Sequence, residues 1–276
     1  MNRRRLITGL TGALSTNLFA SFDRPLGVQL YTVRTLLPSK GEATLRAIAA
    51  IGYKEVEIGL PDAKKFAAVL KETGLKATGS HLDGTVAALE PAKLDEGIGQ
   101  AKELGIPAIG LAYVQAQERK DPAAFWPTFA EKMNQAGERC KKAGLTFYYH
   151  HHNFEFDPRF RAIDALHDHL SKDVALEIDC FWASAGGDEP ADLIEKWKGR
   201  VFALHLKDKA NGPSTFDTDK VRKEDFREVG SGQIDWRKVL RAAASAGVGH
   251  YYVEQDFTPG DPVESLKKSY AYLRTL

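Results

Sequence analysis

The sequence predicts a single (β/α)8 barrel, and three observations support this fold class. Short apolar, β-prone runs alternate along the chain with segments of helical periodicity, and eight such repeats can be counted. A glycine follows the helical pattern and precedes the next strand at five points, Gly52, Gly74, Gly105, Gly144 and Gly247. Alternation of this kind is typical of parallel strands joined by crossover helices, and glycine is favoured just beyond a helix end. No Gly-x-Gly-x-x-Gly motif follows the first strand, which argues against a dinucleotide-binding fold.

Each expected element rests on its own local pattern. The strands are short runs rich in aliphatic and aromatic residues, predicted at residues 26–31, 55–58, 75–81, 108–112, 145–149, 174–178, 201–206 and 250–254. The helices show apolar residues at helical spacing, and they are predicted at residues 44–50, 63–73, 92–104, 125–143, 162–170, 191–197, 236–246 and 262–273. The longest connection, 209–234, contains Gly212-Pro213 and Gly230-Ser231-Gly232 and is expected to form a loop over the barrel mouth.

The composition is that of an ordinary globular protein. The chain has 276 residues, of which 43% are hydrophobic and 27% charged, and its formal net charge is +1. One barrel of roughly 250 residues accounts for this length, and no linker divides the chain, so we expect one domain at 21–276. The neutral charge provides no basic field for nucleic acid. Cys140 and Cys180 lack metal-site spacing and are expected to be buried thiols.

The first twenty residues differ in kind from the rest. Three arginines, Arg3 to Arg5, precede an uncharged, small and apolar run at 8–20. This pattern predicts a twin-arginine-type export signal at 1–20, with a mature protein that begins near Ser21 and works in the periplasm. The alternative is a tail on a cytoplasmic protein. The run is too short and too rich in Gly, Ser and Thr for a membrane span.

Acidic and histidine residues recur where the last four strands end. Glu155, Asp179, His205 and Glu254 follow or end strands five, six, seven and eight. The carboxyl ends of barrel strands converge on one mouth, where barrel enzymes carry out their chemistry. Three buried carboxylates would repel one another unless a cation lay between them. The sequence therefore predicts a divalent metal site, and its oxygen-rich, single-histidine ligand set favours Mn²⁺.

From Gly27 onwards the chain resembles the sugar phosphate isomerase/epimerase family with its xylose isomerase-like barrel. No single motif carries the resemblance, but the series is specific. It consists of Gly-Val-Gln-Leu-Tyr-Thr-Val-Arg (27–34), Gly-Ser-His-Leu (79–82), Tyr-His-x-His-x-Phe-Glu-Phe (149–156), Glu-Ile-Asp-x-x-Trp (177–182), Leu-His-Leu-Lys-Asp (204–208), Gly-x-Gly-x-Ile-Asp-Trp (230–236) and Val-Glu-Gln-Asp (253–256). The family's metal-binding Glu, Asp, His and Glu fall on the four residues at the strand ends.

The resemblance implies a metal-dependent isomerase or epimerase that acts on an unphosphorylated sugar or keto-sugar. Mn²⁺ is the expected ion, with Zn²⁺, Co²⁺ and Mg²⁺ as the other candidates. Glu155 or Glu254 would remove a proton beside the carbonyl and so form an enediolate, which the metal stabilises. The chain departs from the family at His151, where relatives carry Asn, and at Trp182, where some ketose epimerases have a substrate-binding His. The second departure argues against a free ketose.

Other polar residues near the strand ends are candidates for substrate binding. His81 ends strand three, and Lys207 follows His205 in a position from which it can steady an enediolate or pair with Asp208. His150 and His152 face the opposite way from His151, since side chains alternate along a strand. Of these three histidines we expect His152 in the site and His151 in packing. The set of candidates is His81, His152, Lys207, Gln29, Glu57 and Trp182.

Three further readings of the sequence compete with the isomerase or epimerase. The same barrel and metal suit a dehydratase or lyase on an inosose or a 3-keto-glycoside. An apurinic endonuclease shares the architecture but needs a multi-zinc cluster and a basic groove for phosphates. A sugar-binding protein would not need two glutamates beside a metal. The expected partner is a small sugar, without nucleic acid, and exposed barrel loops leave a homo-oligomer open.

Overall fold

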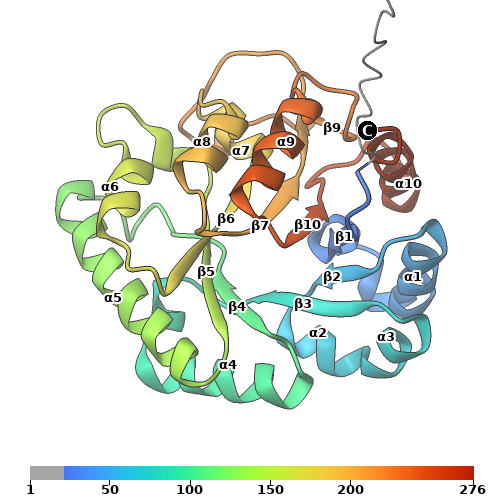
Figure 1. Ribbon diagram of the computed structural model, residues 1–276, viewed down its shortest axis with the longest axis horizontal. Helices are drawn as coiled ribbons and strands as arrows, with labels where there is room; N and C mark the ends of the chain where they lie inside the picture. Colours follow the sequence, from blue (N-terminus) through green and yellow to red (C-terminus); the bar gives the residue numbers. More distant parts are fainter. Residues whose placement is uncertain (1–21) are drawn as a thin grey trace, which may run out of the picture.

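The computed structural model describes residues 22–276, in which eight parallel strands close into a barrel with helices around it (Figure 1). Neighbouring strands in the barrel follow the order β1-β10-β7-β6-β5-β4-β3-β2, which is sequence order around the ring. The predicted fold class is confirmed. The strands are β1 Gly27–Gln29, β2 Glu55–Glu57, β3 Lys76–His81, β4 Ala108–Leu111, β5 Thr146–His150, β6 Val174–Asp179, β7 Val201–Leu206 and β10 His250–Val253.

The outer helices bury one face against the barrel. They are α1 Leu37–Ile51, α2 Leu60–Lys65, α3 Ala67–Thr73, α4 Pro91–Leu104, α5 Pro122–Lys142, α6 Ala162–His169, α7 Cys180–Ala185, α8 Pro190–Lys196, α9 Trp236–Ala246 and α10 Pro262–Leu273. Gly74, Gly105 and Gly247 end α3, α4 and α9 with φ near +70°, a left-handed conformation in which a side chain is strained. The glycine pattern in the sequence therefore marks real helix ends.

The structure departs from the expected boundaries where tertiary contacts decide them. The first strand is only three residues long, and the 3₁₀ helix η1 Leu30–Val33 follows it directly. The helix expected at 63–73 is divided at Phe66, whose backbone leaves the helical region between α2 and α3. Helix α7, which was not expected, begins where the Asp179 side chain accepts the backbone N–H of Trp182 at 2.9 Å.

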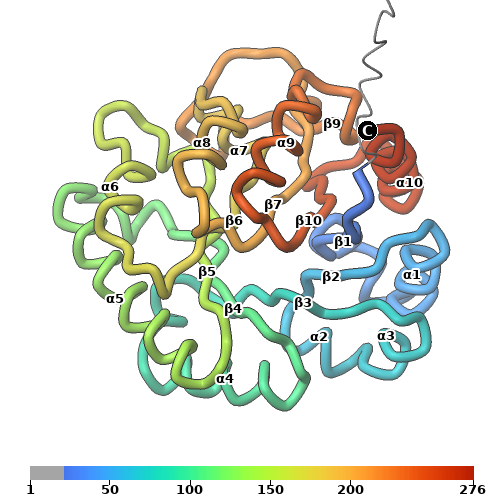
Figure 2. Tube along the Cα trace, viewed as in Figure 1, coloured from blue at the N-terminus to red at the C-terminus, as the bar shows by residue number. Residues whose placement is uncertain are grey.

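The barrel closes between its first and last strands. In Figure 2 the blue start of the described chain lies beside its red end, and β1 pairs in parallel with β10 through Val28 and Val253. Helix α10 then packs beside α1, η1 and β10. The Tyr53 hydroxyl, just before β2, donates to the carbonyl of Leu266 in α10 at 2.9 Å. These contacts hold the end of the chain on the barrel wall.

The long connection after β7 is tied down at both its ends. It contains a two-stranded antiparallel sheet, β8 Asp208–Lys209 with β9 Phe226–Arg227, which the sequence did not predict. Asp208 is buried, and its carboxylate accepts five hydrogen bonds. The donors are the backbone N–H groups of Lys209, Gly230, Gly232 and Ile234 and the indole of Trp236. This one carboxylate therefore joins the start of the connection to its end.

The inside of this barrel is polar, whereas barrel interiors are usually filled by branched aliphatic side chains. Glu57, Tyr148, Glu177 and Tyr252 are fully buried there. The hydroxyl of Tyr148 donates to Glu57, and Thr78 is bonded to the Tyr252 hydroxyl at 2.8 Å. Buried polar groups are tolerated when they are hydrogen-bonded to one another. The interior is therefore a connected network beneath the mouth.

Two expectations concern parts of the chain away from the barrel. The predicted export signal at 1–20 lies outside the described residues. Among the helices of residues 22–276, none combines the length and the apolar character that a membrane crossing requires.

Candidate active site

Four side chains meet where strands β5, β6, β7 and β10 end. His150 and Asp179 are the last residues of β5 and β6, His205 lies level with Asp179 on β7, and Glu254 directly follows β10. We call these four residues the outer group. All are at least 95% buried, and one ligand atom from each lies within 4.8 Å of the others. The parallel register places all four at the same end of the barrel.

The contacts of the outer group suit a cation. His150 Nδ1 lies 3.2 Å from the carbonyl oxygen of Ala112, which can only accept, so Nδ1 carries the proton. In the neutral ring, Nε2 then presents a lone pair 3.3 Å from a carboxylate oxygen of Asp179. His205 Nδ1 and Glu254 Oε2 are buried and lie 2.9 Å apart, and the Lys207 ammonium lies 2.7 Å from the same oxygen. A divalent ion between these atoms would satisfy them all.

The donor set narrows the choice of ion. Two imidazole nitrogens and two carboxylates suit Zn²⁺, Mn²⁺, Co²⁺ or Fe²⁺, because imidazole favours borderline metals while carboxylate also accommodates Mn²⁺. The single-histidine set expected from the sequence is therefore replaced by a set with His150 as well as His205. The residues of the outer group fit a divalent metal.

Lys207 places a buried positive charge beside the outer group. Its ammonium lies 2.9 Å from Asp179, 2.7 Å from Glu254 and 3.1 Å from Asp256. Burial alone would lower the pKa of Lys207, but these three carboxylates outweigh it and hold the pKa well above its usual value. The side chain is therefore charged and directed at the carboxylates of the mouth rather than at Asp208, the partner considered in the sequence.

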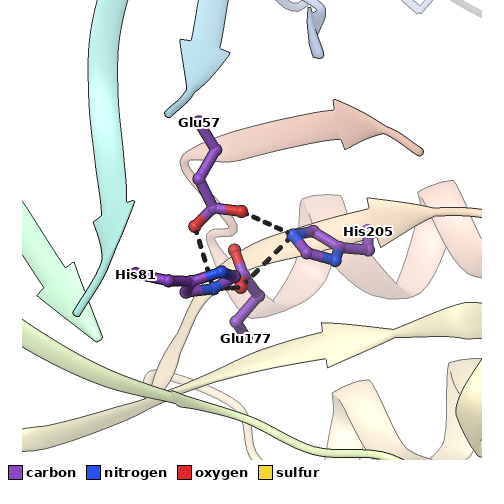
Figure 3. A group of neighbouring side chains, drawn as sticks. All are labelled: Glu57, His81, Glu177 and His205. Atoms are coloured by element: carbon purple, nitrogen blue, oxygen red, sulfur yellow. Dashed lines mark hydrogen bonds and ion pairs between the residues drawn. The ribbon is translucent and has the colours of Figure 1, made fainter. Parts of the chain in front are cut away.

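A second cluster, the inner group, lies deeper in the barrel and shares one residue with the first (Figure 3). It consists of Glu57, His81, Glu177 and His205, from strands β2, β3, β6 and β7. His205 Nε2 lies 2.8 Å from Glu57 and 3.2 Å from Glu177, and His81 Nε2 lies 2.9 Å from Glu177 and 3.2 Å from Glu57. The two carboxylates thus hold both imidazoles.

The inner group orients His205 for the outer group. Because Nε2–H of His205 donates to Glu57, its Nδ1 is left to face Glu254 and Asp179. A carboxylate behind a metal-binding histidine commonly sets its tautomer and ring position in this way. Burial would lower the pKa of His81, but Glu57 and Glu177 raise it above its ordinary value. His81 is therefore held as a proton donor at the edge of the site.

Glu155 is not brought to either group. It lies in η3 Phe154–Phe156, fully buried, where it accepts the Tyr149 hydroxyl and the backbone N–H of His152 at 2.9 Å. Tyr149 points outward and packs against Phe129 of α5, so Glu155, which its hydroxyl reaches, lies on the outer side of the barrel wall. Burial raises the pKa of Glu155 to about 7. The place that the sequence assigned to Glu155 is taken by His150.

The remaining predicted substrate residues surround the clusters. The amide nitrogen of Gln29 lies 3.4 Å from His81 Nδ1, and the amide oxygen of Gln29 accepts the backbone N–H of Tyr31. His152 packs at 5.1 Å from the ring of Trp182, and the Lys207 ammonium lies 5.4 Å from the same ring. These side chains form the wall of the site.

His151 acts from behind the site, as the alternation of the strand predicted. It is fully buried, and its Nε2 accepts the backbone N–H of Asp179 at 3.2 Å. Burial lowers the pKa of His151 to about 4, so the ring is neutral and Nε2 can accept that bond. The interaction fixes the end of β6, where Asp179 enters the outer group.

A cavity of about 790 Å³ opens beside the inner group. Its inner end is lined by Gln29, Glu57 and His81, and it extends outward between η1 and α4. This volume lies within the range of small-molecule sites. A ligand in this cavity would therefore reach His81 directly.

Comparisons with known proteins agree with this architecture. A family model for the xylose isomerase-like TIM barrel matches residues 45–276. An inosose dehydratase from Clostridium perfringens is 28% identical over 160 residues, and the match covers 54% of each protein. The chain therefore spans about half the length of the curated relatives it matches.

Solved structures show the same fold at lower sequence identity. A sugar phosphate isomerase/epimerase from Parabacteroides distasonis superposes with a TM-score of 0.70 at 24% identity, covering 97% of this chain and 98% of that one. The IolI protein with a bound zinc atom superposes with a TM-score of 0.71 at 16% identity, covering 91% and 98%. At these identities the likeness establishes the fold alone.

Proposed function

Because this chain belongs to the xylose isomerase-like TIM barrel family, we propose that it is a divalent-metal-dependent enzyme that removes a proton beside the carbonyl of an unphosphorylated keto-sugar or inosose. The observation that carries the proposal is the outer group, in which the buried His205 Nδ1 faces Glu254 Oε2 at 2.9 Å beside the carboxylate of Asp179. A metal bound there would act as a Lewis acid on a substrate carbonyl. The similarity to inosose dehydratases supports a sugar-like substrate.

Glu254 is the proposed base. Burial would raise its pKa, but Lys207 and His205 outweigh that effect and lower the pKa to about 2, so the carboxylate is ionised at neutral pH. A base of low pKa works through its position, and a positioned base typically contributes about 10²–10⁴-fold to the rate. Lys207 stays protonated beside it and can stabilise negative charge that develops on a substrate oxygen.

After Glu254 has removed a proton, the reaction class depends on which atom of the substrate receives a proton next. Epimerisation by two glutamates would need a second base on the other face of the substrate, and Glu155, the expected partner, lies behind the barrel wall. His81, whose pKa the carboxylates of Glu57 and Glu177 raise, can instead give a proton to a departing hydroxyl or alkoxyl group. We therefore favour a dehydratase or lyase over the isomerase or epimerase that the sequence suggested.

Proton abstraction can be tested by deuterium exchange. The protein loaded with Mn²⁺ or Zn²⁺ is incubated in D₂O with a panel of inososes and keto-sugars and followed by NMR. We expect deuterium beside the carbonyl with the wild type and at least a hundredfold less with Glu254→Gln, the loss expected for a positioned base.

The matched control is Glu155→Gln, which changes a buried glutamate outside the mouth and should leave exchange intact. Release of water or an aglycone identifies elimination, whereas a new epimer or isomer identifies the competing reaction class. Equal losses in both variants would contradict the assignment of Glu254. Absence of exchange over the whole panel, despite bound metal, would contradict the proposed function.

A further inference from the structure

Two exposed aromatic rings stand at the rim of the mouth. Tyr31 in η1 is 50% exposed, and Phe257, three residues beyond Glu254, is 37% exposed. The Arg34 guanidinium lies 3.9 Å from the centroid of the Tyr31 ring and 5.6 Å from that of Phe257. It also donates to the Tyr31 carbonyl at 2.8 Å. This arrangement, which we call the rim platform (Tyr31, Arg34 and Phe257), holds an aromatic surface toward solvent.

The rim platform adjoins the cavity that begins at the inner group. Tyr31 and Arg34 line this cavity together with Glu57 and His81, so one space runs from the inner group to these two residues of the platform. Its volume of about 790 Å³ lies within the range of sites that hold drug-sized ligands, which are larger than one hexose. The cavity therefore has room for a second ring beyond the one that reacts.

The lining of the outer part indicates which kind of ring fits. Its ionisable side chains are mainly carboxylates, Asp62, Asp83 and Glu96, against Arg34 and Lys93 as the cations. Carboxylates accept hydrogen bonds from hydroxyl groups and repel phosphate. The C–H face of a pyranose is weakly positive and matches the negative face of an aromatic ring. A neutral sugar ring suits this surface better than a phosphorylated one.

We propose that the rim platform is a binding site for a second sugar ring, so that the substrate is a two-ring glycoside whose inner ring lies beside His81 at the inner end of the cavity. The inference builds on the proposed function, since it places the inner ring beside His81, the proton donor of the proposed elimination. Tyr31 stacks on the outer ring, and the carboxylates of the cavity accept hydrogen bonds from its hydroxyl groups. The platform thereby selects substrates by length.

The test measures binding without turnover. The metal-loaded protein is titrated calorimetrically with glucose and with a panel of α- and β-linked glucose disaccharides. We expect at least one disaccharide to bind more tightly than glucose. Tyr31→Ala should weaken that disaccharide about tenfold, equivalent to about 1.4 kcal/mol, and leave glucose unchanged. Phe160→Ala is the matched control, because Phe160 is also exposed, at 45%, but lines a different groove with Arg119 and Trp126.

Three results would overturn the inference. Disaccharides that bind no more tightly than glucose, or do not bind, exclude a second ring. An equal effect of Tyr31→Ala on glucose and disaccharide places Tyr31 at the first ring, and an equal effect of Phe160→Ala makes the loss non-specific. Because binding is read without chemistry, a protein that fails the deuterium exchange test but shows the Tyr31-dependent preference retains the second-ring site and loses only the proposed reaction.

Discussion

The buried carboxylate of Glu155 should make the stability of the protein depend on pH. Burial raises the pKa of Glu155 from 4.5 to about 7 in the folded protein, whereas the unfolded chain has the ordinary value. The folded state therefore binds a proton more tightly than the unfolded state. This contribution to stability is fully present below pH 4.5 and is lost as the pH rises to about 7.

The size of this pH-dependent change in stability follows from the difference between the pKa values of Glu155 in the folded and unfolded states. A difference of 2.5 units between the two pKa values, at 1.36 kcal/mol each, is about 3 kcal/mol of lost stability above pH 7. Glu155→Gln imitates the protonated acid, since its amide can donate to the Tyr149 oxygen and its carbonyl can accept from His152. We expect the variant to match the wild type near pH 4.5 and to exceed its stability by about 3 kcal/mol near pH 8.

The assay is urea denaturation of both proteins at a series of pH values between 4.5 and 8. Taking the difference between the two proteins removes the contribution of every other titrating group. Glu103→Gln serves as control, because the side chain of Glu103 is 66% exposed and its substitution should give a flat difference. A flat difference for Glu155→Gln as well would refute the argument, because it would mean that burial does not perturb this carboxyl.

Three further substitutions test other parts of the structure. Asp208→Ala removes a buried carboxylate that accepts five hydrogen bonds and should lower the free energy of unfolding by about 3–5 kcal/mol in urea titrations, while an unchanged value would show that the connection holds without it. His150→Ala should lower the metal content measured by mass spectrometry after dialysis, whereas Glu155→Gln should keep it; the reverse order would restore Glu155 as the ligand. Gly79→Ala places a methyl group 3.1 Å from the Tyr148 hydroxyl and should lower the free energy of unfolding by about 1–3 kcal/mol. Gly99→Ala in α4 meets nothing within 4 Å and should raise it by up to about 1 kcal/mol. Thermal melts that rank the two variants the other way would contradict the packing argument.

The fold could be predicted from the sequence because its signals are local and repeated. Glycines such as Gly74 and Gly105 end helices through their own backbone freedom, and apolar runs mark strands by composition. The short sheet of β8 and β9 could not be predicted, since two-residue strands carry no periodicity. The anchor of that connection, Asp208, is defined by donors that lie up to 28 residues away.

The site could be predicted only in part, and the segment that follows strand β5 shows why. Asp179, His205 and Glu254 lie on or next to their strands, so position along the chain is enough to bring them together. Glu155 lies five residues beyond His150, and the turn of η3 carries it to the other side of the barrel wall. The alternation of His150 with His151 contained the correct signal, because it places His150 on the inner face.

The polar interior of the barrel limits which substitutions this protein can tolerate. Tyr148 donates to Glu57, and Glu57 and Glu177 both hold the two histidines of the inner group, so an aliphatic residue at any of these positions would leave buried partners without bonds. If these residues are replaced one at a time, the intermediate variants must be less stable than either the polar interior or a fully aliphatic one. The helix surfaces and the rim are free of this constraint. New specificities on this scaffold should therefore arise at the rim, while the interior is inherited as a unit.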